Sequence, residues 1–269
     1  MKFFSLAVSY LKKHWSLLIA SLIAGVAVSV AHVGGGFFAY LNQFFTYGDL
    51  SFYEVYSRIS PIIGSWWGTL LALLVLAGFF AYIVGVIDRH MKIGEFRLGS
   101  PMRKINENLS FILIFLVVFL LIEELVNVLV ALASAAVMSI AAPVVAYLIT
   151  ILAYVVIQGV AIIFFVMGAL WVPESIITGM SMRDSFSAAL EKGKGHVGKM
   201  LLGALLCAVP AFLVSMAGAF VGPAIRVIFN AVSATAIIAY IPVFVFTAYY
   251  EISDLEREDL SPAKNFWKR

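Results

Sequence analysis

Charged residues and cysteines are scarce in this chain. Only 12% of its 269 residues are charged, against about 25% in typical soluble proteins. Hydrophobic residues make up 63% of the chain, and its mean hydropathy is +1.03. These values exclude a compact water-soluble domain and identify an integral membrane protein. The single cysteine, Cys207, rules out an intrachain disulfide.

The chain also lacks the motifs of common enzyme classes. It has no HExxH, CxxC, GxSxG, DDxxD or phosphate-binding glycine loop. Its adjacent glutamates, Glu123 and Glu124, are a feature of CAAX-type intramembrane proteases, but Val128 stands where their EExxxR motif has arginine. We therefore expect a non-enzymatic protein with no catalytic residue, metal site or cofactor.

Six long apolar runs are present, and each is long enough to cross a hydrocarbon core of about 30 Å as a helix. They cover residues 15–40, 61–86, 109–140, 143–171, 200–221 and 224–249. None alternates apolar and polar residues as the strands of a membrane β-barrel do. The sequence therefore predicts an all-α integral membrane protein with six transmembrane helices in one membrane domain, residues 1–269.

The basic residues predict the topology. Sixteen of the 18 Lys and Arg residues lie before the first run, between the second and third, between the fourth and fifth, or after the sixth. The exceptions are Arg58 and Arg226. Because cytoplasmic loops carry the excess of Lys and Arg, we expect both termini, including a tail at residues 250–269, to be cytoplasmic. A prokaryotic plasma membrane is the expected location, membrane lipids are the expected partners, and nucleic acid is not.

Weak internal repeats accompany the six runs. A proline stands at or near the start of each even-numbered run, at Pro61, Pro143 and Pro223, where its missing amide hydrogen is tolerated. Residues 4–14 and 186–196 share a Phe-Ser start, a lysine and a histidine at identical offsets. This pattern predicts three pseudo-repeated hairpins, about 1–90, 91–172 and 173–269, each preceded by a cytoplasmic amphipathic segment.

Two stretches resemble a known group of proteins. They are Trp171-Val172-Pro173-Glu174 followed by Gly179, Ser185-Phe186, Ala189 and Lys194 to Val197, and Tyr249-Tyr250-Glu251. They are similar to a diffuse prokaryotic superfamily of six-span proteins of unknown function, which includes the membrane domain attached to some glycerophosphoryl diester phosphodiesterases. The resemblance implies a six-span architecture. The catalytic barrel of those phosphodiesterases has no counterpart here, so their activity is not implied.

Polar residues within the spans are the candidate site. Ionisable side chains are costly inside a bilayer and often mark function. Glu124 lies 15 residues beyond Leu109, about 22 Å along a helix, and residues of two other spans lie at comparable depth. The candidate ligand or proton site consists of Glu123, Glu124, Asn127, His32, Arg226 and Asn230. A structural ion pair between Arg226 and a glutamate, or protonated glutamates bonded to Asn230, are the alternatives.

Three other features predict local structure. Ser51 and Glu54 form a capping box that predicts a helix over residues 52–59. We expect this helix to lie in the membrane interface or to cover the candidate site, which we call the polar layer, as a lid. Ser21, Gly25 and Ser29 recur every four residues, which favours close approach of another helix. We expect Gln158 to form a hydrogen bond with a neighbouring helix.

The sequence leaves three functions open. We expect an integral membrane protein that interacts with lipid through its interfacial helices and a cavity in its outer half. The alternatives are a proton-coupled or small-solute transporter that uses the polar layer, and a subunit of a larger membrane complex. A transporter requires a water-accessible cavity that reaches Glu123 and Glu124.

Overall fold

The computed structural model describes residues 2–31, 51–99, 101–139, 143–219, 221 and 223–260. Every regular element within these ranges is helical, which confirms the predicted all-α fold. The elements are α1 (Lys2–Lys13), α2 (Ser16–Ala31), α4 (Phe52–Ile59), α5 (Pro61–Gly64), α6 (Trp66–Ile93), α7 (Pro101–Met138), α8 (Pro143–Ala169), α9 (Trp171–Thr178), α10 (Met182–Lys194), α11 (Val197–Ala219), α12 (Pro223–Ile252) and the 3-10 helix η1 (Glu258–Leu260).

The part of the chain that the structure describes contains five helical stretches long and apolar enough to cross a membrane. They are Trp66–Ile93, Ile105–Met138, Val144–Thr178, Val197–Gly218 and Ile225–Ile252. Helices α1 and α2 are bent by 98° relative to each other, and they meet the same criterion only as a pair. Five or six spans therefore agree with the predicted class of protein.

The helices extend beyond the apolar runs that predict them. Helix α7 begins at Pro101 rather than Leu109, and α6 ends at Ile93 rather than Val86. The end of an apolar run marks only where apolar residues stop. The helix itself continues until it reaches a residue that terminates helices. For α6 that residue is Gly94, whose φ of 70° is left-handed and favours glycine.

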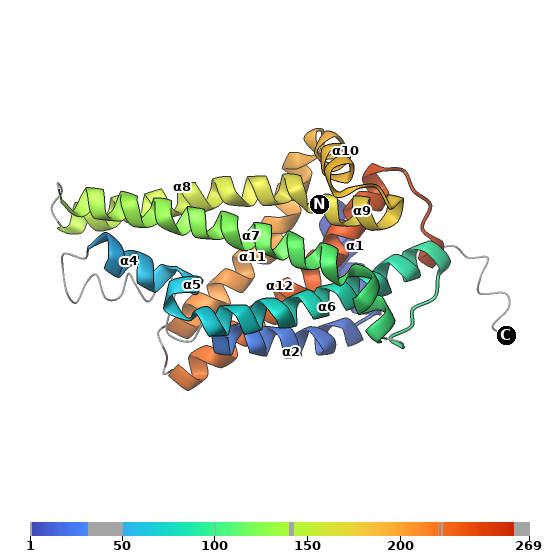
Figure 1. The fold of residues 1–269 in the computed structure, drawn as a ribbon, viewed down its shortest axis with the longest axis horizontal. Coiled ribbons are helices and arrows are strands. Elements are labelled where there is room, and N and C mark those ends of the chain that lie inside the picture. Colours follow the sequence, from blue (N-terminus) through green and yellow to red (C-terminus); the bar gives the residue numbers. More distant parts are fainter. Residues whose placement is uncertain are drawn as a thin grey trace.

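Helix α12 lies at the centre of the bundle (Figure 1). It packs against α2, α11 and α6, while α7 packs against α6 and α8. In α12, 67% of the most apolar stretch is buried, against only 11% in α8. We call the two ends of the bundle the α4 end and the α10 end, after the helices that lie there (Figure 1). Beyond α12 the chain returns to the bundle, and η1 packs against α6.

The predicted small-residue face of α2 is confirmed as a helix contact. Ser21 and Ser29 are buried, and each hydroxyl donates to a carbonyl one turn earlier in α2. Gly25 lies against α12, where an added Cβ would be 2.9 Å from the Thr235 amide nitrogen and 3.0 Å from the Ala231 carbonyl oxygen. Only glycine allows the two backbones to approach this closely.

We expect Gly25→Ala to destabilise the protein by about 1–3 kcal/mol, because the methyl group overpacks the contact with α12. Gly78→Ala in α6 is the matched control, since an added Cβ there meets nothing within 4 Å and alanine favours helix more than glycine. The effect of each substitution is measured as the change in the free energy of unfolding in mixed detergent micelles. Equal effects of the two substitutions would contradict the proposed α2–α12 contact.

Candidate functional site

The structure places the predicted polar residues on two helices. Glu123, Glu124 and Asn127 lie on α7, and Arg226 and Asn230 lie on α12. His32 lies outside the described residues. The contacts of each side chain show what the polar residues do.

Glu124 is a buried carboxylate, with 7% of the residue exposed. The Tyr56 hydroxyl donates to its Oε2 at 2.9 Å, and the Ser60 hydroxyl lies 2.9 Å from both carboxylate oxygens. The Ile62 backbone amide donates to Oε1 at 3.2 Å. Donors from α4, from α5 and from the residue between them therefore surround one carboxylate of α7, which compensates the cost of burying it.

The local sequence explains how α4 brings these donors to Glu124. Ser51 and Glu54 form the predicted capping box, so the expected helix at 52–59 is confirmed. Tyr56 and Ser60 are four residues apart and therefore lie on one side of the chain as it leaves this helix. An apolar contact accompanies the hydrogen bonds: buried residues of α4 pack against buried residues of α7. They are Val55, Ile59, Val126, Val130 and Ala131.

Glu123 accepts a hydrogen bond from a different helix, α8. The side-chain amide of Gln158 on α8 donates to Glu123 Oε1 at 3.1 Å, which confirms the predicted role of Gln158 in helix contact. Asn127 is also buried, and its side-chain nitrogen is among the buried polar atoms that have no hydrogen-bond partner. The polar residues of α7 thus contribute to contacts with both α4 and α8.

Asn230 forms its hydrogen bond with a helix that does not contact the two glutamates in this way, α11. Its side-chain oxygen accepts a hydrogen bond of 2.8 Å from Ser215 of α11. The hydrogen bonds of the two glutamates come from α4, α5, α8 and the residue between α4 and α5, and that of Asn230 comes from α11. Similar depth in the membrane therefore does not give these residues common partners.

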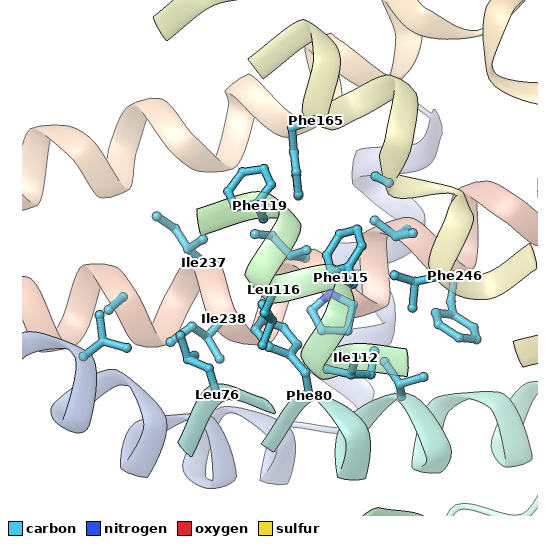
Figure 2. Close-up of a pocket in the computed structure, with 18 residues that line it drawn as sticks. Leu76, Phe80, Ile112, Phe115, Leu116, Phe119, Phe165, Ile237, Ile238 and Phe246 are labelled. Atoms are coloured by element: carbon cyan, nitrogen blue, oxygen red, sulfur yellow. The ribbon is translucent and has the colours of Figure 1, made fainter. Parts of the chain in front are cut away.

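A separate feature, an apolar cavity of about 380 Å³, lies between α12 and the helices α6, α7 and α8. Figure 2 shows Phe80 of α6, Phe119 of α7 and Phe165 of α8 around it. The lining residues are Val28, Leu76, Phe80, Val84, Ile112, Phe115, Leu116, Phe119, Phe165, Ala169, Val172, Ala234, Ile237, Ile238, Ile241, Pro242, Val245 and Phe246. None of them is titratable, so the cavity has no group for acid–base or nucleophilic chemistry.

A smaller cavity of about 100 Å³ adjoins the first one. The two cavities share five lining residues of α8 and α12, namely Phe165, Ala169, Ile237, Ile241 and Val245. The smaller cavity extends the space toward α11, where Cys207 is part of its wall. Neither cavity is lined by Glu123 or Glu124.

The apolar lining determines what the larger cavity can hold. A buried water molecule needs two to four polar partners, so an apolar cavity stays dry. An empty cavity lowers stability by about 24 cal/mol per Å³ in soluble proteins. The cavity of 380 Å³ is only partly enclosed, so this figure for closed cavities is an upper limit for it. The geometry therefore favours an apolar occupant.

The sequence predicted a cavity in the outer half, at the depth of the polar residues, but it did not predict this one. Its lining is indistinguishable from ordinary span residues. Nearly every position of these helices is apolar, so periodicity does not separate a cavity wall from a lipid-facing surface. The one local signal is small residues next to large aromatic ones, such as Ala169 near Phe165 and Ala234 before Ile237. That signal also describes ordinary close packing.

A partly buried ion pair lies at the α10 end. Glu174 of α9 is buried, and Lys192 of α10 donates to it at 2.5 Å and to the Tyr249 hydroxyl at 3.2 Å. Burial lowers the pKa of Lys192, but hydrogen bonds with Glu174 and Tyr249 outweigh that effect, so the pKa is raised. The lysine therefore stays charged and holds α10 against α9 and α12.

A histidine pair lies at the same end of the bundle, between α1 and α6. The His14 and His90 rings are 4.6 Å apart, and Phe96 stacks on His14 at 4.1 Å. Tyr10 and His90 Nδ1 are joined by a hydrogen bond of 2.9 Å. Burial, His90 and Lys13 lower the pKa of His14 to about 4, with a smaller opposing effect of Asp259. His14 is therefore neutral at physiological pH.

This shift predicts that the protein loses stability on acidification. His14 has an ordinary pKa of 6.5 when unfolded and about 4 when folded, so the unfolded chain takes up the proton first. We expect the melting temperature to fall between pH 6.5 and pH 4, and the fall to be smaller in His14→Phe. Melting curves across this range test it, and identical pH profiles for the two proteins would contradict it.

The chain was compared with models of protein families, with curated proteins and with solved structures, and none of them matches.

Proposed function

We propose that this protein is a non-enzymatic membrane protein that binds a lipid acyl chain in its central cavity. One observation supports this proposal: a cavity of about 380 Å³, lined only by apolar residues, lies among helices that are able to span a membrane. Its volume falls within the range of about 300–1,000 Å³ that is typical of ligand pockets.

The energetics favour an acyl chain. Bilayer hydrocarbon is as apolar as the cavity wall, so moving a chain between them gains little hydrophobic free energy. The gain comes from removing an unfilled volume and from dispersion contacts with the ring-rich wall. Lipid is also the most abundant apolar molecule next to these helices. A lipid acyl chain is therefore the class of occupant that we propose.

The proposed location is a prokaryotic plasma membrane with both termini in the cytoplasm, as the distribution of basic residues indicates. In this orientation the α10 end is cytoplasmic. The proposed repeat is supported in its first and third units, where α1 and α10 each end in a lysine, two residues follow, and α2 and α11 begin. In the middle unit α7 is continuous from Pro101.

The transport alternative is less well supported. Transport through the glutamates requires water to reach them, yet neither described cavity is lined by either one. The carboxylate of Glu124 already accepts hydrogen bonds from Tyr56, Ser60 and Ile62. These contacts favour a structural role in holding α4 to α7.

Native mass spectrometry of the protein extracted in a mild detergent tests the proposal. We expect a major species that carries one lipid and retains it when the detergent shell is removed. The lipid's mass and fragmentation identify its chains. A protein that appears only in the lipid-free form after gentle extraction would contradict the proposal.

A further inference from the structure

Helix α10 has a partly exposed apolar strip beside the side that is buried in the bundle. At 100° per residue, Ser185, Ala189 and Gly193 fall on one side, and all three are buried against the bundle. The adjacent strip consists of Met182, Phe186 and Leu190. Met182 is 39% exposed and Phe186 is 41% exposed. The protein therefore covers this apolar strip only in part.

Basic residues border this strip. Arg183, Ser187 and Lys194 form the next row around the helix, and all three are exposed. The acidic residues Asp184 and Glu191 lie farther round, on the side opposite the buried one. Going around α10, the order is thus bundle, apolar strip, basic row and acidic side. This is the arrangement of a helix that lies in a membrane interface.

Contacts with the bundle hold α10 in this orientation. The Trp171 indole donates to the Met182 carbonyl oxygen at 3.0 Å and to the Ser185 hydroxyl at 3.1 Å. The Phe186 ring packs edge-on against the Trp171 ring, with centroids 5.2 Å apart. Lys192 adds the ion pair with Glu174 on the other side of the helix. The exposed strip is therefore fixed in position.

Exposed apolar residues also lie on the spans next to α10. Helix α10 packs against α8 and α9 and leads directly into α11 (Figure 1). Phe164 of α8 and Leu202 of α11 are exposed apolar residues of two of these helices. No residue of α10 lines the central cavity, so this surface is separate from the proposed acyl-chain site.

We infer that α10 is a phospholipid-headgroup site. Met182 and Phe186 contact the upper part of the acyl chains, while Arg183 and Lys194 bind the phosphate groups just above them. Long basic side chains reach the phosphate level from such positions. Each basic residue near an anionic surface favours binding of anionic lipid by roughly fivefold. The site therefore prefers anionic over zwitterionic phospholipids.

Spin labels at single cysteines test the placement of α10. The full chain carries Cys207→Ser, and labels are attached in lipid nanodiscs at Phe186→Cys and, as the matched control, at Asp184→Cys. We expect the label at 186 to collide mainly with oxygen, which dissolves in lipid, and the label at 184 mainly with a water-soluble nickel complex. A label at 186 that is open to nickel, or shielded from both reagents by another protein, would overturn the inference.

Spin-labelled phosphatidylglycerol and phosphatidylcholine test the headgroup preference. We expect the wild-type protein to hold more of the anionic lipid in its first shell, and Arg183→Gln with Lys194→Gln to lower that preference by at least fivefold. Glu191→Gln is the control and should not lower it. An unchanged preference in the double variant would overturn the inference. Retention of the cavity lipid is measured separately, in native mass spectra. Failure of the headgroup proposal can therefore be told apart from failure of the proposed function.

Discussion

Ala234→Phe should weaken lipid binding at least tenfold, because Ala234 lines the central cavity and the ring would take space from the acyl chain. At about 24 cal/mol per Å³ of cavity volume, a tenfold loss of affinity, about 1.4 kcal/mol, requires the ring to take only roughly 60 Å³ from the acyl chain. Delipidated protein is titrated with phosphatidylcholine, and bound lipid is counted by intact mass.

Ala236→Phe is the matched control, two residues away on the same helix. Ala236 is exposed and faces away from the cavity, so lipid affinity should be unchanged. The stability of the delipidated variants tests whether the cavity is normally empty. If the cavity is normally empty, Ala234→Phe fills a void and stabilises the protein without affecting retained lipid. That outcome would contradict the proposed function.

Glu124→Ala should lower the free energy of unfolding by about 2–4 kcal/mol. The substitution leaves Tyr56, Ser60 and the Ile62 amide without their acceptor. Hydrogen bonds inside membranes contribute about 0.6 kcal/mol each on average, and an unsatisfied buried group adds about 1–3 kcal/mol. Unfolding in mixed detergent micelles measures the change.

Glu123→Ala is the control for this prediction, because it removes one hydrogen bond, from Gln158. We expect a loss of about 0.6 kcal/mol. Proteolysis near α4 gives a second readout, since release of α4 from α7 should accelerate cleavage in Glu124→Ala only. Equal destabilisation by both substitutions would show that Glu124 does not hold α4 in place.

Local patterns in the sequence predicted local structure well. Apolar runs located the long helices, because a bilayer requires about 20 apolar residues for each span. The Ser51–Glu54 capping box predicted α4, since its hydrogen bonds form within four residues. The small-residue face around Gly25 predicted a close helix contact, although it did not identify α12 as the partner.

The polar residues show the limit of such reasoning. Counting residues along a helix gives depth, so Glu124 and Asn230 were correctly expected to lie within long helices. Depth does not give the direction in which each side chain points around its helix. Glu124 turns toward α4 and Asn230 toward α11, and these directions depend on which helices are neighbours.

The cavity depends on tertiary packing still more strongly. It exists because α7 and α8 stand away from α12 along residues such as Phe119, Phe165 and Ile237. No single helix encodes that separation, and each residue in the lining is equally compatible with a filled core. The same reasoning applies to α10, where the sequence predicted an amphipathic helix but not which flank the bundle leaves exposed.

The most direct test of the central claim is an experimental structure of the protein in nanodiscs made from its own membrane lipids. We predict continuous, elongated density in the cavity between Phe80, Phe119 and Phe165, with the length and thickness of an acyl chain. A cavity that has closed through direct contact of α7 and α8 with α12, or that contains no density at a resolution where side chains are clear, would contradict the proposed lipid-binding function.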